Sequence, residues 1–320
     1  MKNDRQQTVP NVLKSLAELL GTEVINGRVE IPEKYGNGYC AGFVFNGHIR
    51  ILILNYELHE EIVLENPDVN NLGKMILFKF QHIFPKTEIE STENQLKLIP
   101  SVLIGTSRMN TDVIIPIDTK TEAINIDVDA NYLNELLYTS EKSPILQSLL
   151  ENTQPLLFEQ MVFPSLQKIV DEMITESVDE TFEVFFMRIK AEELICRLLM
   201  ELVKRDEKHI YALNGNDVQI IYKVRERILT HLDVPPILQE LAVSSNMSPT
   251  KLKRLFKQIF GNSIFNYYQE FRMKEAARFL KEEKLSVSEV GYRLGFTNLS
   301  HFSRMFEQHM GMKPKKYSVQ

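Results

Sequence analysis

The spacing of hydrophobic residues changes twice along this 320-residue chain. Residues 11–20 place Val and Leu three or four positions apart, which predicts a short helix ended by Gly21. From residue 28 to residue 129 the apolar residues come in short runs rich in Val and Ile, separated by Gly, Asn, Pro and Asp. This second pattern predicts many short antiparallel strands that form a barrel or a sandwich.

One turn within the strand-rich region can be placed from its sequence. The pair Asn46-Gly47 favours the left-handed backbone of a tight hairpin turn. It therefore predicts that residues 39–45 and 48–55 pair with each other. Eight runs carry the strand pattern, at residues 28–32, 39–46, 48–56, 60–65, 75–81, 98–105, 112–117 and 123–129.

Beyond residue 129 the apolar spacing becomes helical. We predict helices at residues 130–138, 144–151, 162–175 and 180–205, and the last of these has the strongest pattern. Apolar side chains in this last segment cover more than one narrow face. They fit a helix buried against the strand-rich domain, or a helix shared with a partner subunit, because periodicity alone does not separate the two arrangements.

A polar stretch at residues 206–216 ends in Asn-Gly-Asn and predicts a linker between two domains. The periodic segments after it are all helical, near residues 218–232, 237–244, 248–260, 264–281, 286–294 and 298–310. The predicted organisation is a strand-rich domain at 1–129, a helical extension suited to dimerisation at 130–205, the linker, and an all-helical domain at 217–320.

The net charge changes sign near the predicted boundary between the two domains. Residues 217–320 hold 17 Lys and Arg against 10 Asp and Glu, a net charge of +7, whereas the preceding residues hold 20 against 33, a net charge of −13. The net charge of −6 for the whole chain would point away from nucleic acid. Its distribution predicts instead that the basic domain meets phosphate.

Composition excludes several classes of protein. Cys40 and Cys196 are the only cysteines, too few for a disulfide framework or a cysteine-rich zinc site. Residues 1–10 are polar and predict no signal peptide, and no apolar run approaches the roughly 18 residues that cross a bilayer. We therefore expect a cytoplasmic protein without membrane contact.

Catalytic and metal-binding patterns are weak in the strand-rich domain. His48, His59 and His82 are isolated, whereas metal-dependent barrel enzymes need a closely spaced His-x-His with further Glu and His ligands. Catalytic triads, Gly-rich phosphate loops and the Asp pair with a later Lys of a phosphoacceptor receiver are not evident either. We expect no catalytic residue, no metal, no cofactor and no control by a histidine kinase.

The basic domain contains one two-helix pattern twice. Residues 238–261 predict a short helix, a polar break and a second helix that opens at Ser248-Pro249, where Ser is a good cap and Pro suits the first turn. Residues 286–311 predict the same arrangement. Two helices with an exposed, basic second member are typical of the DNA-binding helix-turn-helix.

The two units match in register. Arg-Leu-Phe at 254–256 lies 50 positions before Arg-Met-Phe at 304–306, and the turns differ by one residue. We infer an internal duplication. The 18 residues at 264–281 predict one connecting helix, about 27 Å long at 1.5 Å per residue. A rod of this length can place two recognition helices in successive major grooves of DNA, about 34 Å apart.

Residues 237–317 resemble the AraC/XylS-type family of bacterial transcription regulators, through the segments LAVSSNMSPTKLKRLFKQIFGNSIFNYYQEFRMKEAARFL and SVSEVGYRLGFTNLSHFSRMFEQHMGMKPKKY. The resemblance implies a seven-helix domain with two helix-turn-helix units, each placing its second helix in a major groove. It also implies an α+β multidomain chain with an N-terminal cupin-like barrel followed by helices. Residues 30–62 are similar to the sensor half of siderophore-responsive members, which does not identify a ligand.

The resemblance also assigns candidate DNA contacts by position. Arg and Lys side chains can donate two hydrogen bonds to guanine, which discriminates it by about 1–3 kcal/mol. For Arg254 and Arg304 the alternative is an ion pair with a nearby Glu. The base-contact candidates are Thr250, Lys253 and Arg254 in the first unit and Leu299, Ser300, His301 and Arg304 in the second.

Further lysines are expected on phosphates, where they add affinity without sequence information. Two positions depart from the expected pattern. Leu299 cannot hydrogen-bond to a base, and Gly291 stands where the family usually has Ala, which weakens a helix. The phosphate-contact candidates are Lys251, Lys257 and the C-terminal Lys313, Lys315 and Lys316, for which a solvated tail is the alternative.

The predicted function is a sequence-specific transcription regulator, taken as an activator from the family alone. Its expected partners are promoter DNA, RNA polymerase, a small-molecule effector and a second copy of the chain. Two alternatives remain: a cupin-type metal-dependent enzyme domain fused to a DNA-binding module, and an obligate dimer whose N-terminal domain binds no small molecule.

Overall fold

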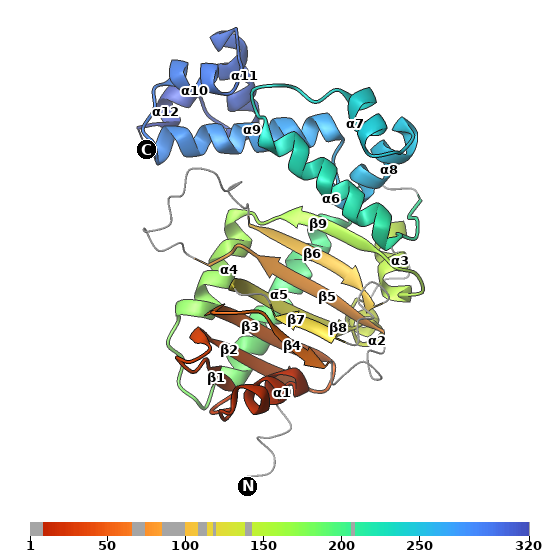
Figure 1. Cartoon of the computed structure of the whole chain (residues 1–320), viewed down its shortest axis with the longest axis vertical. Coiled ribbons are helices and arrows are strands. Elements are labelled where there is room, and N and C mark those ends of the chain that lie inside the picture. The colour runs from red at the N-terminus through yellow and green to blue at the C-terminus, as the bar shows by residue number, and fades with distance from the viewer. Residues whose placement is uncertain are drawn as a thin grey trace. The chain divides into compact units, whose positions relative to one another are not determined.

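A computed structural model of the chain (Figure 1) describes residues 9–65, 74–84, 100–107, 114–117, 120–137, 143–205 and 209–319. The chain divides into two compact units, residues 1–213 and residues 214–320. The first unit mixes helices and strands, whereas the described part of the second contains helices only. Three residues of the predicted linker, 206–208, lie outside the described residues.

A seven-stranded antiparallel sheet forms the base of the N-terminal unit, in the order β1-β2-β3-β8-β5-β6-β9 (Figure 1). Two further strands, β4 (Ile62–Glu65) and β7 (Ile114–Ile117), pair with each other as a separate sheet. The strands of the large sheet are β1 (Arg28–Glu30), β2 (Gly36–Phe45), β3 (Ile49–Leu58), β5 (Met75–Gln81), β6 (Ser101–Thr106), β8 (Lys120–Asp129) and β9 (Leu157–Met161).

The predicted hairpin is confirmed, and the predicted barrel is not. β2 and β3 pair without interruption, and Asn46 and Gly47 between them take positive φ angles of 42° and 73°. In the described residues β1 and β9 are each paired on one side only, so the hydrogen-bonded sheet is open. Strand β9 was not predicted, because its residues LFEQM show no clear alternation of apolar and polar side chains.

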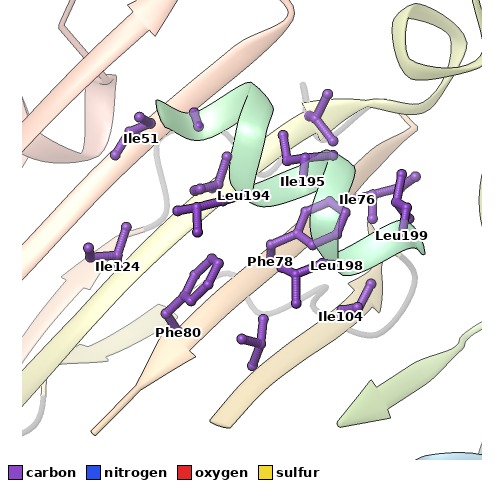
Figure 2. Packing of buried hydrophobic residues seen from close by; sticks show 14 of the residues in the cluster. Ile51, Ile76, Phe78, Phe80, Ile104, Ile124, Leu194, Ile195, Leu198 and Leu199 are labelled. Carbon is purple, nitrogen blue, oxygen red and sulfur yellow. The ribbon is translucent and has the colours of Figure 1, made fainter. Parts of the chain in front are cut away.

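One apolar core lies between this sheet and helix α5 (Glu183–Leu202). Phe78 and Ile124 of the sheet face Leu194 and Leu198 of the helix (Figure 2), and all four side chains are fully buried. Each such burial contributes about 1.5–3 kcal/mol. Helices α2 (Ala130–Leu136), α3 (Pro144–Glu151) and α4 (Pro164–Thr175) complete this layer, close to their predicted positions.

A smaller core lies under helix α1 (Asn11–Leu20). Leu13, Leu16 and Leu20 pack there with Cys40 of β2, whereas the next residues of the same strand face the α5 core. Successive strand residues point to opposite faces, so β2 is covered on both sides. Burial raises the pKa of the Cys40 thiol to about 12.

The C-terminal unit has seven described helices, the number that the resemblance implies. Helix α9 (Ile264–Lys281) is central and packs against α6, α8, α10, α11 and α12. No helix in the described parts of the chain is both long and apolar enough to cross a membrane. The other six helices are α6 (Gly215–Thr230), α7 (Leu238–Ser244), α8 (Pro249–Phe260), α10 (Val287–Arg293), α11 (Leu299–Met310) and α12 (Pro314–Tyr317).

Candidate nucleic-acid interface

The first helix-turn-helix unit consists of α7 and α8. The Ser248 hydroxyl caps α8 by accepting a hydrogen bond from the Lys251 backbone N–H, and Gly261 ends the helix with φ 75°. Such a cap contributes about 1 kcal/mol. Leu252, Phe256 and Ile259 are buried on the inner side of α8. The two caps and this apolar face fix the helix so that its opposite side remains exposed.

The exposed side of α8 carries a row of polar and cationic residues. Thr250, Lys253, Arg254 and Lys257 are all exposed, and their spacing of three or four positions places them on neighbouring turns of one helical face. Helix α8 contains no acidic residue. The candidates of the first unit are therefore brought together, on a surface suited to phosphate and base edges.

Lys251 differs from its neighbours on α8. Its Nζ atom lies 2.9 Å from Oδ1 of Asp217 in α6, and the lysine side chain is 41% exposed. This ion pair has no local sequence signal, because Asp217 lies 34 residues earlier in the chain. Part of the positive charge of Lys251 is thus already balanced within the domain.

The second unit consists of α10 and α11 and is capped more fully. Ser286 and Glu289 form a reciprocal capping box at the start of α10. The Asn298 side chain accepts hydrogen bonds from the backbone N–H groups of Ser300 and His301 at the start of α11. Asn298 is therefore the N-cap residue of α11.

Three of the four candidates on α11 are exposed. Ser300, His301 and Arg304 face outward, and the His301 ring packs edge-on against Phe296 with a centroid distance of 5.8 Å. Within the described residues Arg304 makes no ion pair, so the predicted alternative of a Glu partner is not seen. α11 contains one Arg, one Glu and no Lys, and is therefore less cationic than α8.

Leu299 is only half-exposed, because it packs against the first helix of its own unit. A Cβ atom added to Gly291 would lie 2.5 Å from Cδ2 of Leu299, so the leucine occupies the space that an alanine at position 291 would need. The equivalent pair in the first unit is Ala242 and Pro249. A small residue on one helix is thus matched to a large residue on the other.

The turns of both units depend on a positive φ angle. Asn246 has φ 50° and Gly295, at the equivalent position, has φ 74°. Glycine is required at 295 because an added Cβ would collide with the backbone carbonyl of Asp233. Asn is one of the few other residues that tolerate this conformation, which explains its place in the first turn.

A buried arginine fixes the second turn to α9. Arg272 donates a hydrogen bond from Nε to the Leu294 carbonyl oxygen at 2.9 Å, and its guanidinium lies 3.8 Å from the centroid of the Phe296 ring. Burial lowers the pKa of Arg272. The cation serves as a structural link, since only 3% of the residue is exposed.

Two further arginines are engaged in ion pairs away from the exposed faces of α8 and α11. Arg278 pairs with Glu275 and Glu283, and Arg293 also pairs with Glu283. Burial alone would raise the pKa of Glu283, but the two arginines hold it below its usual range. These cations therefore contribute less to a DNA-binding surface than their number suggests.

The C-terminal lysines belong to a folded turn. Pro314 is buried and the Tyr317 ring packs against Phe306, with a centroid distance of 5.4 Å. This short helix, α12, was missed because KPKK resembles a solvated tail. Docking of α12 on the second unit fixes the backbone of three exposed lysines, Lys313, Lys315 and Lys316.

The described histidines of the N-terminal unit do not form a cluster. The His48 ring stacks on Tyr132 at 4.8 Å, and Nε2 of His59 lies 3.2 Å from the Glu33 carbonyl oxygen. Among the described residues no three His, Cys, Asp or Glu side chains are grouped so that they could hold a metal ion.

Comparison with known proteins identifies the type of domain in the C-terminal unit. A family model described as a helix-turn-helix domain matches residues 241–320. The HTH-type transcriptional regulator GbdR of Pseudomonas aeruginosa is 33% identical over 108 residues, which cover 34% of this chain and 29% of that protein. Residues 241–320 form an AraC-type helix-turn-helix domain.

Two other similar proteins match different fractions of this chain. Histidine kinase P4 of Formosa agariphila is 25% identical over 279 residues, which cover 82% of this chain and 18% of that protein. A solved structure of a regulator from Chromobacterium violaceum, with an AraC-type DNA-binding domain, is 25% identical and covers 33% of this chain and 96% of its own, with a TM-score of 0.31. This chain spans less than a third of the length of GbdR or of the kinase.

Proposed function

We propose that this chain is a sequence-specific DNA-binding transcription regulator of the cytoplasm. The observation that carries this proposal is the repeated geometry of the AraC-type domain. Both second helices are capped at the N-terminus, buried on one side and exposed on the other. Both pack against the single helix α9. A rigid connection of this kind suits the docking of α8 and α11 on two segments of one promoter.

Within this proposal the first unit supplies most of the direct base contacts. Arg254, Lys253 and Thr250 are its base-contact residues, and Arg304, Ser300 and His301 serve the second unit. Lys257, Lys313, Lys315 and Lys316 contact phosphates. Lys251 is a weaker phosphate candidate because Asp217 already pairs with it. Leu299 is reassigned from base contact to packing within the second unit.

Arg254→Ala tests the assignment of base readout. Loss of a bidentate contact to guanine is expected to cost about 1–3 kcal/mol at one base pair and to relax the preference there. Binding-site selection from random DNA, followed by titration of the selected site, measures both effects. Arg227→Ala is the matched control, because Arg227 is exposed on α6, outside both units. Unchanged affinity and base preference for Arg254→Ala would remove its assigned role.

Lys316→Ala tests the phosphate contacts separately. It is expected to weaken specific and non-specific DNA about equally and to reduce the salt dependence of binding by about one phosphate contact. Titrations of one specific and one unrelated duplex at several salt concentrations provide the comparison. An effect on the specific site alone would move Lys316 to the base-reading group.

We further propose that the N-terminal unit senses an effector and forms a homodimer through α5. Several large apolar side chains lie exposed along this helix and at its two cap positions: Phe182, Phe185, Ile189, Met200 and Val203 are 37–62% exposed, and Cys196 is also exposed. Their positions are symmetric about the middle of the helix. In an antiparallel pair, Phe182 would meet Val203 of the second copy, Phe185 would meet Met200, and Ile189 would meet Cys196.

A cysteine cross-link tests this register. Ile189→Cys is expected to form a disulfide with Cys196 of the second copy under mild oxidation, giving a covalent dimer. The wild-type chain, with Cys196 alone, is the control. Seven residues separate positions 189 and 196, about 10 Å along a helix, so two Cys196 residues would lie too far apart in this register. Efficient linkage of the wild type, or none of the variant, would contradict the register.

The remaining features of the proposal rest on the relatives. GbdR is a transcription regulator, which favours contacts with RNA polymerase and a regulatory rather than enzymatic role. The histidine kinase relative is similar across most of this chain but is named for an activity that this chain has no assigned residues to perform. Activation as the direction of control, and the similarity to siderophore-responsive sensors, remain predictions from the sequence.

A further inference from the structure

A cavity of about 640 Å³ opens beside helix α1 in the N-terminal unit. The buried part of its lining comes from Ala17, Gly42 and Phe43. Gly27 also lines it and accepts a backbone hydrogen bond from Gly42 at 2.8 Å. The volume lies within the roughly 300–1,000 Å³ that is typical of small-molecule sites.

The wall of the cavity is negatively charged. Glu18 and Glu23 come from the region of α1, whereas Glu180 and Glu183 come from the beginning of α5. Lys14 is the single cation among the described residues that line it. Two distant parts of the sequence thus bring four carboxylates to one cavity that also has an apolar surface.

Among the described residues, no salt bridge neutralises the Glu183 carboxylate. Burial raises the pKa of Glu183, and the nearby charge of Glu180 raises it further. Asn26 donates a hydrogen bond to Oε1 of Glu180 at 3.4 Å, which orients that carboxylate. A positive ligand group would relieve the repulsion between the two carboxylates.

We propose that this cavity binds an organic cation with an apolar body, as the effector site of the regulator. The apolar lining from Ala17 and Phe43 would receive the body, and the carboxylates of Glu180 and Glu183 would bind the cationic group. An anionic ligand of the same shape would meet repulsion from the wall. This inference rests on the proposed sensor function, but its test does not require DNA.

Calorimetric titration of the full chain with three probes tests the ligand class. Tryptamine combines an apolar ring with a cation, indole-3-propionate combines the same ring with an anion, and spermidine has charge without an apolar ring. Tryptamine is expected to bind at least about tenfold more tightly than either of the others, because loss of one charge-assisted contact costs roughly that factor. Equal binding of the anion, or binding of none of the three, would overturn the proposal.

Three variants locate the binding to this cavity. Glu183→Gln is expected to weaken tryptamine about tenfold, and Val184→Trp to block it by filling space from the exposed Val184 position. Glu176→Gln is the matched control, because Glu176 is exposed four residues before Glu180 in the chain but does not line the cavity. Unchanged binding in the first two variants would place the ligand elsewhere.

A separate measurement connects the cavity to regulation. Tryptamine is expected to change the affinity of the wild-type chain for its selected DNA site and to leave Val184→Trp unaffected. If the chain binds DNA but no probe, the effector proposal fails and the regulator proposal stands. If it binds tryptamine but no DNA, the assigned ligand class of the cavity stands and the regulator proposal fails.

Discussion

Gly291→Ala separates helix propensity from side-chain packing in the second helix-turn-helix unit. Glycine in a helix interior is about 0.5–1 kcal/mol less favourable than alanine, so propensity alone predicts that the substitution stabilises α10. The geometry predicts the opposite. The new methyl group would lie 2.5 Å from Cδ2 of Leu299 and 3.4 Å from Cδ1 of Phe302, and the first of these distances is far below van der Waals contact.

The magnitude follows from what must move. Overpacking of this kind typically costs about 1–3 kcal/mol. Rotation of the end of the leucine side chain would bring the cost to the lower end of that range. Subtracting the propensity gain leaves an expected net loss of about 0.5–2 kcal/mol. In a Leu299→Ala background the methyl group has room, so the same substitution should stabilise α10 by about 0.5–1 kcal/mol.

Hydrogen exchange of the full chain, followed by mass spectrometry, gives the appropriate assay. It reports local opening free energies for peptides from α10 and α11, whereas whole-chain melting of a two-unit protein is not two-state. Four proteins complete a double-mutant cycle: wild type, Gly291→Ala, Leu299→Ala and the double variant. If Gly291→Ala stabilises α10 equally in both backgrounds, Leu299 does not pack on Gly291 in solution and the reasoning is refuted.

Two further predictions concern local geometry elsewhere in the chain. Gly295→Ala should destabilise the second unit by more than about 2 kcal/mol, since the positive φ angle and the Asp233 carbonyl both disfavour a Cβ, whereas Gly311→Ala, with φ 75° and open space, should cost about 1 kcal/mol. Equal losses of hydrogen-exchange protection in α10 and α11 for the two variants would contradict this. Iodoacetamide at neutral pH should label exposed Cys196 and spare buried Cys40 until urea unfolds the chain. Equal labelling of both thiols in the native chain would contradict the burial of Cys40. Because burial raises the Cys40 pKa from 9.0 to about 12, the contribution of this thiol to the free energy of unfolding is complete below pH 9 and is lost as pH rises towards 12.

Local patterns predicted most of the secondary structure, because each element carries its own signal. The α9 helix begins and ends at the predicted residues, and Asn46-Gly47 forms the predicted turn. β9 and α12 were missed for a shared reason. Neither LFEQM nor PKKY is periodic enough to indicate its structure, and each is held by contacts with distant segments, β6 for the strand and α9 for the helix.

Closure of the sheet was a different kind of prediction. Alternating strands show that a sheet exists, but whether its edges meet depends on strand order and tilt. The order places β8 between β3 and β5 and leaves β1 and β9 at the edges in the described residues. The strand runs alone do not carry that information: they predicted a barrel or a sandwich, and the resemblance favoured the cupin-like barrel.

Candidate DNA contacts could be predicted where exposure follows from helical spacing, and not where a long-range partner intervenes. Thr250, Lys253 and Arg254 lie on the exposed face that their spacing implies. Lys251 differs because Asp217 approaches from another helix, and Leu299 because Gly291 leaves it a space. The duplication contained a signal for the second case, since Ala242 and Pro249 occupy the matching positions in the first unit.

In the proposed interface, this exchange of small and large residues gives the two units different roles. α8 begins with proline and contains no acidic residue. Its Lys253, Arg254 and Lys257 are exposed on the proposed DNA-binding face, whereas Lys251 is paired with Asp217. α11 begins with Leu299, whose packing on α10 restricts the angle between the two helices of its unit, and carries one Arg beside one Glu. Substitutions on α8 should therefore act mainly through individual base pairs and salt dependence. Substitutions at the Gly291–Leu299 contact should act through the placement of the whole of α11, and so alter several base positions of its half-site together.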